Sequence, residues 1–212
     1  MEQFERALIP LGLTLLAGLA TGIGSLIALC FKRVTPGVLR LMMGFSAGVM
    51  LYVSFVELLP AATAEHALGF FWGNVVFFGG FAAMAAIDML VPHEFLAEKV
   101  PGIGGDHGAH RGILKAGLLT AVGVMIHNFP EGMAVFASAL SDPKLGLSLA
   151  VAIGLHNIPE GIAVAMPIYA ATNRRRPAFV ISLVSGLAEP LGALIAGVWL
   201  LPILDGKVLA GV

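Results

Sequence analysis

Long apolar runs dominate the chain, and short polar stretches separate them. Each run is close to the ~20 residues that a helix needs to cross ~30 Å of hydrocarbon. The predicted fold class is therefore all-α, a polytopic integral membrane helix bundle that forms one transmembrane domain over residues 1–212. The pattern predicts six membrane helices, at residues 7–31, 38–61, 70–91, 113–140, 145–170 and 178–201.

The composition agrees with this prediction and excludes other classes of protein. Hydrophobic residues make up 58% of the chain and charged residues only 12%, which lies far from the usual composition of a soluble domain. Cys30 is the only cysteine, so one chain has neither a disulfide framework nor a thiolate metal cluster. The basic residues fall between apolar runs, which does not match a nucleic-acid-binding surface.

The first apolar run is predicted to stay in the protein as a membrane helix. Glu2 and Glu5 make the leading segment acidic, whereas a secretory signal begins with basic residues. The run from Ala7 to Phe31 is also longer than the apolar core of a signal.

The basic residues predict how the helices are oriented. Nine of the twelve basic residues lie on the side of the membrane that holds the loops after the first, third and fifth helices. Only Arg6, Lys144 and Lys207 lie on the other side. Cytoplasmic loops carry the excess of Lys and Arg, so we expect the N-terminus outside a multi-pass protein of the cell inner membrane. The nine residues are Lys32, Arg33, Arg40, Lys99, Arg111, Lys115, Arg174, Arg175 and Arg176.

The longest loop, residues 92–112, is expected to be a flexible cytoplasmic segment. It is rich in glycine and contains His107 and His110. Two interpretations stay open, a transient acceptor of metal ions and a linker with incidental histidines.

Two nearly identical polar hexapeptides interrupt the fourth and fifth apolar runs: His-Asn-Phe-Pro-Glu-Gly at 127–132 and His-Asn-Ile-Pro-Glu-Gly at 156–161. On a helix that advances 100° per residue, the carboxylate of Glu131 lies between His127 and Asn128, on one face. One carboxylate can then bridge two cations. Ionisable groups at this depth are costly, and by default they mark a functional site.

The two hexapeptides are predicted to face each other near the middle of the membrane. Residues 141–144, Ser-Asp-Pro-Lys, form a short turn, so the helices that it joins are antiparallel neighbours. Glu131 and His156 lie at similar distances on either side of Pro143, which places both ~18–20 Å below the turn.

A proline within each hexapeptide is expected to kink its helix. Pro130 cannot donate a hydrogen bond to the carbonyl of Ile126, nor Pro159 to that of Leu155. In a membrane the freed carbonyls need a polar cavity or a ligand, and broken helices with polar groups at mid-depth are typical of transport sites.

The donor set predicts the type of ion. Imidazole and carboxylate suit Zn²⁺, Fe²⁺, Mn²⁺ and similar divalent cations, and the lack of thiolates argues against Cu(I). An all-oxygen cage, as Ca²⁺ prefers, is also lacking. The sixth helix adds Glu189 before a proline, for which both a metal contact and a protonated, hydrogen-bonded carboxyl stay open. The predicted metal ligands are His127, Asn128, Glu131, His156, Asn157, Glu160 and Glu189.

Other acidic residues receive weaker assignments. Glu57 is interpreted as an entrance or interface residue, and Asp88 as a candidate for an exit path. Glu65 and His66, on an outer loop, are candidates for gathering cations. The methionines are expected to pack or to face lipid, with no metal role.

These residues resemble the Zrt-, Irt-like (ZIP) family of metal transporters. The resemblance rests on the two hexapeptides, on Gly-Leu-Ala-Glu-Pro at 186–190 and on residues 45–60, and it extends over nearly the whole chain. It implies a binuclear site in the fourth to sixth helices and uptake of divalent metal toward the cytoplasm. One cation would use His127, Glu131, His156 and Glu160, and the other Asn128, Glu131, Asn157, Glu160 and Glu189. The family has eight membrane helices, so we expect its last two helices to be missing from these 212 residues.

Two other functions stay open as alternatives, an intramembrane metallohydrolase and a membrane metal sensor that does not transport. The hydrolase would need a spare general base, typically in His-Glu-x-x-His, whereas asparagine follows each histidine here. A di-iron oxidase would carry Glu-x-x-His, which is the reverse order. We therefore expect a transporter and not an enzyme, with no cofactor and with Zn²⁺ and Fe²⁺ as transported ions. The expected partners are divalent metal ions and the lipid bilayer, without nucleic acid; a homodimer stays open.

Overall fold

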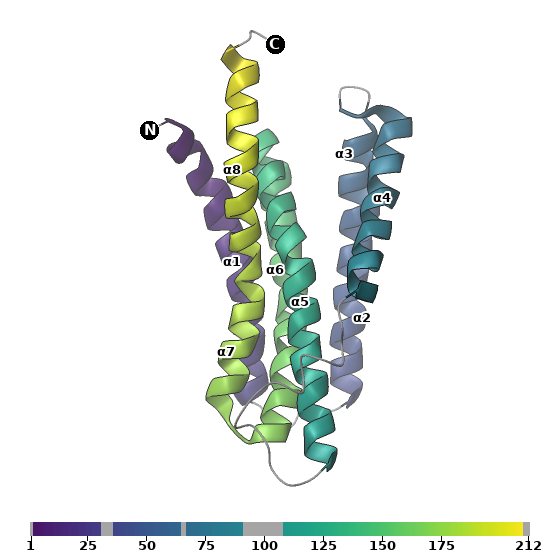
Figure 1. The fold of residues 1–212 in the computed structure, drawn as a ribbon, viewed down its shortest axis with the longest axis vertical. Coiled ribbons are helices and arrows are strands. Elements are labelled where there is room, and N and C mark those ends of the chain that lie inside the picture. The colour runs from purple at the N-terminus through teal and green to yellow at the C-terminus, as the bar shows by residue number, and fades with distance from the viewer. Residues whose placement is uncertain (1, 31–35, 65–66, 91–107, 210–212) are drawn as a thin grey trace.

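Helices make up nearly all of the chain that the computed structural model describes, which is residues 2–30, 36–64, 67–90 and 108–209. No strand occurs in these residues. Figure 1 labels the elements, except the π-helix η1, which lies between α2 and α3. They are α1 (Glu2–Cys30), α2 (Pro36–Tyr52), η1 (Val53–Leu58), α3 (Leu59–Thr63), α4 (Gly69–Leu90), α5 (Gly108–Ser141), α6 (Pro143–Thr172), α7 (Arg175–Gly186) and α8 (Ala188–Leu209).

Six segments of the described chain are long and apolar enough to cross a membrane. The predicted all-helical membrane fold is therefore confirmed. The boundaries differ most at α8, which ends at Leu209, whereas the sequence predicted the sixth helix to end at residue 201. α5 begins at Gly108 and so includes residues that the sequence assigned to the loop before residue 113. The segments are Glu5–Cys30, Arg40–Thr63, Gly69–Ala86, Gly112–Ser141, Pro143–Thr172 and Arg175–Trp199.

The second segment contains a π-helix that the sequence did not predict. In η1 the N–H of Leu59 donates to the carbonyl of Ser54, five residues back. Pro60 follows directly, and because it has no N–H it cannot donate to Val56 in the usual α-helical pattern. Glu57 lies in this irregular segment and is partly buried.

The sixth segment is broken, whereas the sequence predicted one helix over 178–201. α7 ends at Gly186 and α8 begins at Ala188, with Leu187 between them. Pro190 has no N–H for the carbonyl of Gly186, which explains the break at this point. In contrast, α5 and α6 stay helical through Pro130 and Pro159, so the predicted kinks there remain a prediction.

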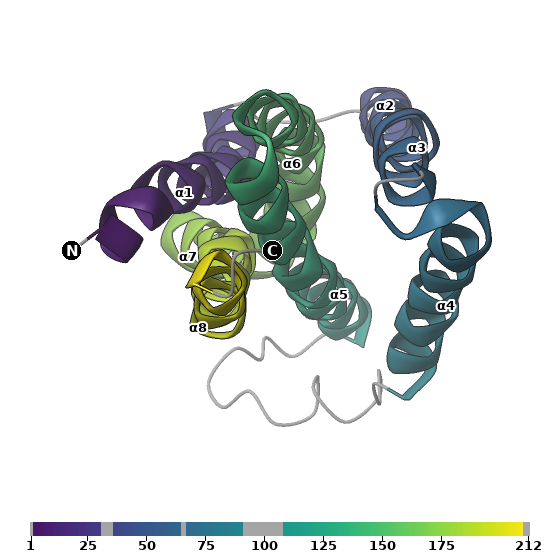
Figure 2. The ribbon, with the colours of Figure 1, turned by 90° about the horizontal axis from the view of Figure 1, so that it is seen from above.

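A compact bundle of α1, α5, α6, α7 and α8 forms the centre of the structure (Figures 1 and 2). α6 packs against both α1 and α5, and α8 packs along α5. α2 leans on α6, while α4 packs mainly against α3 and stands to one side in the view of Figure 2. α3 and α4 form a helical hairpin. Large apolar side chains at the start of α4, Phe70, Phe71 and Trp72, are exposed, as suits a surface that faces lipid.

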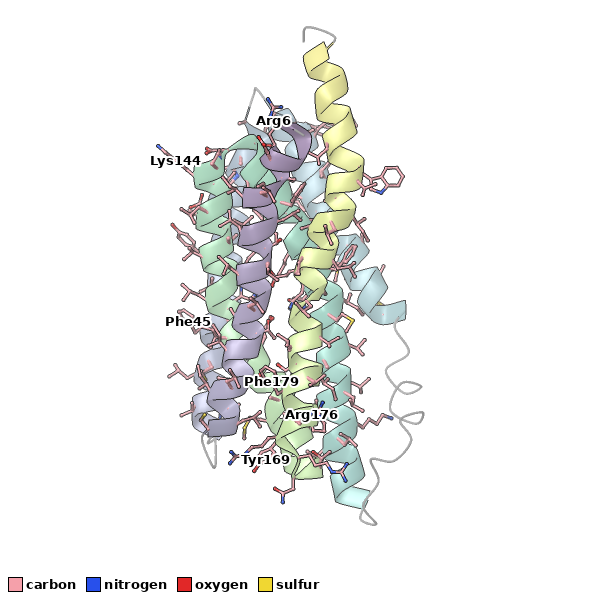
Figure 3. All side chains as sticks on the ribbon, turned by 90° about the vertical axis from the view of Figure 1, so that its left-hand side faces the viewer. Arg6, Phe45, Lys144, Tyr169, Arg176 and Phe179 are labelled. Carbon is pink, nitrogen blue, oxygen red and sulfur yellow. The ribbon has the colours of Figure 1, made fainter. Side chains whose placement is uncertain are left out.

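The short connection between α5 and α6 is confirmed. Asp142 caps α6, since its side chain accepts a hydrogen bond of 2.8 Å from the N–H of Lys144, and Pro143 occupies the first helical turn. Figure 3 shows Lys144 and Arg6 at one end of the bundle and Arg176 at the other. This agrees with the two sides that the basic residues predicted.

The backbones of α1 and α6 approach each other at glycines. A Cβ atom on Gly24 would lie 2.0 Å from the carbonyl oxygen of Ile158, far inside van der Waals contact. Small residues at such points let membrane helices pack closely, because van der Waals contact drives their association.

We predict that Gly24→Ala destabilises the protein and that Gly12→Ala, on the same helix, does not. A Cβ on Gly12 meets nothing within 4 Å, and alanine is the better helix former. The clash at Gly24 should lower the free energy of unfolding by about 1–3 kcal/mol. Unfolding of the purified variants in detergent measures both effects; equal stability of the two would contradict the close approach.

Candidate metal site

The two hexapeptides face each other across the interface of α5 and α6, as predicted. Each histidine contacts the glutamate of the opposite helix. His127 Nε2 lies 2.8 Å from Glu160 Oε1, and His156 Nε2 lies 3.3 Å from Glu131 Oε2. His156 Nε2 is also 4.0 Å from Glu160 Oε1, within its own helix. The antiparallel pair thus brings two imidazoles and two carboxylates into one cluster.

The two asparagines are anchored by backbone carbonyls of neighbouring helices. The amide nitrogen of Asn128 donates to the carbonyl of Ser185 in α7, at 3.3 Å. The amide nitrogen of Asn157 donates to the carbonyl of Ala17 in α1, at 2.9 Å, and to Glu189 Oε1. These bonds orient both amides so that their oxygen atoms stay unpaired.

Glu189 joins the cluster from the first turn of α8, directly after the break at Leu187. Its side chain is fully buried and contacts Asn157. The backbone of α8 comes very close to α5 at this point, since a Cβ on Gly132 would lie 1.9 Å from the carbonyl oxygen of Glu189. Because Gly132 has no side chain, α8 can approach α5 closely enough to bring Glu189 into the cluster.

The buried polar atoms of this cluster largely lack partners. Among the described residues, nine buried side-chain nitrogen or oxygen atoms have no hydrogen bond, and eight of them belong to predicted metal ligands. Two of the eight, His156 Nε2 and Glu131 Oε2, still lie in the 3.3 Å contact given above. A buried polar atom without a partner costs about 1–3 kcal/mol, so such a concentration indicates a place for a polar ligand. The nine atoms are Thr21 Oγ1, Asn128 Oδ1, both oxygens of Glu131, both ring nitrogens of His156, Asn157 Oδ1, Glu160 Oε2 and Glu189 Oε2.

The site in this conformation is an array of imidazole–carboxylate pairs. In the part of the chain that is described, no three His, Cys, Asp or Glu side chains are arranged to hold a metal ion as they stand. Binding of a cation would therefore require it to enter between the paired groups, by small rotations of these side chains.

A groove leads to this cluster from one side. It has a volume of about 530 Å³, and His127 and Glu160 form part of its wall. Its other walls are mostly apolar and come from α2, α4, α5 and α6, including Met43, Phe81 and Thr120. Accordingly His127 is the most accessible of the four histidine and glutamate side chains in these pairs, with 37% of its side chain exposed.

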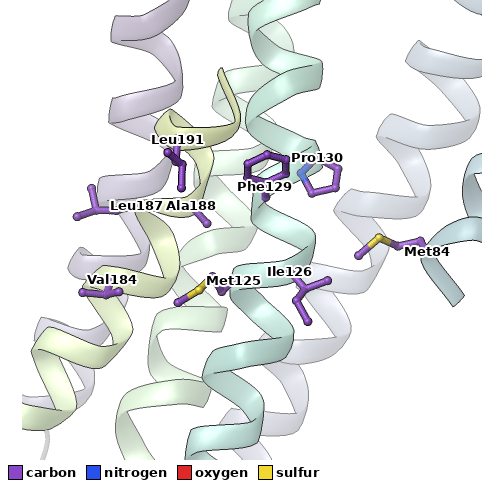
Figure 4. A pocket seen from close by; sticks show the side chains of 9 residues that line it. All are labelled: Met84, Met125, Ile126, Phe129, Pro130, Val184, Leu187, Ala188 and Leu191. Atoms are coloured by element: carbon purple, nitrogen blue, oxygen red, sulfur yellow. The ribbon is translucent and has the colours of Figure 1, made fainter. Parts of the chain in front are cut away.

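A second cavity, of about 570 Å³, has Pro130 in its wall (Figure 4). Its lining is apolar and comes from α4, α5, α7 and α8. Met84 and Met125 are part of this lining. The lining residues are Met84, Met125, Ile126, Phe129, Pro130, Val184, Leu187, Ala188 and Leu191.

The remaining candidates do not join the cluster or lie outside the described residues. Glu57 lies in η1, and no hydrogen bond or ion pair within the described residues joins its side chain to the two hexapeptides. Asp88 is in α4, but its side chain is not described, and the same holds for His110 in α5. Glu65, His66 and His107 lie outside the described residues, so their assignments stay predictions.

Comparison with known proteins assigns the family. Residues 90–201 match the family described as ZIP Zinc transporter. The zinc transporter ZupT of Corynebacterium glutamicum is 51% identical over 211 residues, which cover 95% of this chain and 80% of that protein. ZupT of Chlorobium phaeovibrioides is 53% identical, with 94% and 80% covered, and ZupT of Streptococcus mutans is 46% identical, with 92% and 76% covered.

The chain belongs to the ZIP family. It is thus a multi-pass membrane protein of a family of transporters, and membership argues against an enzyme. The matched segment of this ZIP protein includes both hexapeptides and Glu189, but it does not include α1. Sequence reasoning also gave α1 no part in the site, although the carbonyl of Ala17 holds Asn157.

We predict that Asn157→Leu destabilises the metal-free protein by about 1–3 kcal/mol, because the carbonyl of Ala17 and the carboxyl of Glu189 lose their donor in a buried place. Asn74→Leu is the control, since Asn74 is partly exposed and its amide bonds only to its own helix. Unfolding in detergent with a chelator measures the difference; equal stability of both variants would contradict the anchoring role.

Proposed function

We propose that this protein carries divalent metal cations, zinc first and also iron, across the cytoplasmic membrane through a binuclear site between α5, α6 and α8. The observation that carries the proposal is the concentration of buried side-chain nitrogen and oxygen atoms without a hydrogen bond on the predicted ligands, eight of nine such atoms in the described chain. A divalent cation would supply the missing partner for these atoms at once. Membership of a family of zinc transporters supports zinc as the cargo.

One cation binds on the imidazole side, to His127, His156, Glu131 and Glu160. Each of these histidines already lies within 2.8–3.3 Å of a carboxylate of the opposite helix. A cation that enters between an imidazole and its carboxylate keeps both as ligands, and nitrogen with carboxylate oxygen is a donor set that zinc accepts. The attraction between the charges offsets part of the cost of burying the carboxylates.

The other cation binds on the amide side. Asn128 and Asn157 offer their unpaired amide oxygens, and Glu189 offers Oε2. Glu131 and Glu160 are shared by both cations as bridges. This side provides only oxygen ligands, which suit harder cations than imidazole does.

The cation leaves toward the cytoplasm through the groove beside His127. The residues of its wall on α5, such as Thr120 and Gly123, lie between His127 and the end of α5 that the basic residues assign to the cytoplasm. Ala163, on α6, lies on the same side of Glu160. This position of the groove supports uptake into the cytoplasm, with the N-terminus outside. All described helices belong to one transmembrane domain.

We expect Glu131→Ala and Glu160→Ala each to abolish zinc uptake into proteoliposomes. Both cations lose a shared ligand. Loss of a residue that only hydrogen-bonds to a metal ligand already lowers metal affinity or activity about 10–100-fold, so loss of the ligand itself should cost more. Glu5→Ala removes an exposed carboxylate of α1 and should leave uptake unchanged. Normal flux in either site variant would contradict the bridging role.

Acidification should weaken zinc binding. Imidazoles coordinate only when neutral, so protons compete with the metal, and affinity should fall at least about tenfold from about pH 7 to about pH 5. His127→Gln removes one imidazole and should make this dependence shallower. Equilibrium binding to the purified protein measures it; an affinity that is constant over this range would count against imidazole ligation.

A further inference from the structure

Thr21 of α1 carries the ninth unpartnered atom, the one that belongs to no predicted ligand. Its side chain is fully buried. Two other buried hydroxyls of α1 are satisfied within their own helix, because Thr14 donates to the carbonyl of Leu11 and Ser25 to that of Gly22. The Thr21 hydroxyl makes no such bond, although threonine in a helix commonly bonds to a carbonyl three or four residues back.

The two carbonyls that Thr21 would use both face neighbouring helices. The carbonyl of Ala17 accepts the amide nitrogen of Asn157. The carbonyl of Gly18 faces α7, where a Cβ on Gly186 would lie 2.3 Å from it. The asparagine of the second hexapeptide therefore occupies one of the two carbonyls that would normally satisfy this hydroxyl.

α1 contacts α6 in the same way as α8 contacts α5. On α5, a Cβ on Gly132 would lie 1.9 Å from the carbonyl oxygen of Glu189. On α6, a Cβ on Gly161 would lie 1.9 Å from the carbonyl oxygen of Thr21. The corresponding contacts one turn away also match. A Cβ on Gly192 would lie 2.1 Å from the carbonyl oxygen of Phe129, and a Cβ on Gly24 would lie 2.0 Å from that of Ile158.

The asparagine anchors and the sequence follow the same correspondence. Asn157 bonds to Ala17, four residues before Thr21, and Asn128 bonds to Ser185, four residues before Glu189. The sequence reads Gly-Leu-Ala-Thr-Gly-Ile-Gly at 18–24 and Gly-Leu-Ala-Glu-Pro-Leu-Gly at 186–192. Thr21 thus takes in α1 the place that Glu189 takes in α8.

From this correspondence we infer that the hydroxyl of Thr21 lies on the Asn128 side of the polar cluster. Glu189 contacts Asn157, whose counterpart in the other hexapeptide is Asn128. Thr21 Oγ1 lies beside Gly186, 2.7 Å from where a Cβ on that glycine would be, and the neighbouring Ser185 holds Asn128. The two halves of the site therefore present a carboxylate on one side and a neutral hydroxyl on the other.

We propose that Thr21 Oγ1 is a further contact for the divalent cation on the amide side, opposite Glu189. The proposal rests on the proposed transport function. A hydroxyl has one donor and two acceptor positions, and the threonine side chain is two carbon atoms shorter than that of glutamate. Thr21 therefore contacts the cation through a water molecule that the cation retains, and the amide side holds a partly hydrated ion.

The test compares Thr21→Val, Thr21→Ser and Thr14→Val, the last being a matched control on the same helix. Zinc affinity in detergent and the KM of zinc uptake into proteoliposomes are measured for each. Thr21→Val should weaken binding and raise KM about three- to tenfold, the effect of one lost hydrogen bond, and Thr21→Ser should restore both. Thr14→Val should leave both unchanged, because its hydroxyl bonds only to its own helix.

Thermal unfolding without metal separates this role from a structural one. Valine has the shape of threonine without the buried unpaired hydroxyl, so Thr21→Val should be at least as stable as the native protein. If Thr21→Val binds zinc as tightly as the native chain, or if serine does not restore binding, the proposal is overturned. A Thr21→Val protein that fails to fold would also overturn it, since the hydroxyl would then be structural.

The same experiment distinguishes failure of this proposal from failure of the transport function. Glu160→Ala is measured alongside. If Glu160→Ala loses zinc binding and Thr21→Val does not, only the role of Thr21 is wrong. If neither variant differs from the native protein, both proposals are wrong.

Discussion

The structure depends on satisfying polar groups inside a membrane, where water cannot do so. The contacts between His127 and Glu160 and between His156 and Glu131 join α5 to α6 within two segments that are apolar enough to span a membrane, where an unpaired charge would be costly. Neither helix can hold its hexapeptide there alone. The reciprocal pairing therefore constrains the register of α5 against α6.

The helices around α5 and α6 supply further polar groups to the site. α1 and α7 provide backbone carbonyls that hold the two asparagines, and α8 provides Glu189. Such contacts require close backbones, which glycines at the crossings permit, as at Gly132 and Gly161. Anchoring of the amide nitrogens thus leaves the oxygen atoms of both asparagines buried and without hydrogen bonds. The stability lost to these unpaired atoms is the stability that a bound cation can restore.

Much of this could be predicted from the sequence. Run length and hydropathy suffice for six spans, because a membrane helix must be long and apolar. The repeated hexapeptides and the short turn at Asp142 suffice for a site between two antiparallel helices. The break at Leu187 and the π-helix at Val53–Leu58 were not predicted, since proline indicates a missing donor but not how the chain adapts to it. α1 contributes to the site through its packing on α6, and the apolar pattern of a single helix does not predict which helix it packs against. The resemblance between residues 18–24 and 186–192 was the one sequence signal for it.

The most direct test of the central claim is the position of bound zinc. Anomalous diffraction from crystals of the zinc-loaded protein locates the metal independently of any assumed ligand. Our account predicts zinc between α5 and α6, in contact with Glu131 and Glu160, with His127 and His156 on one side and the asparagines on the other. Zinc found only at surface positions, or hexapeptides that still pair imidazole with carboxylate at saturating zinc, would contradict it.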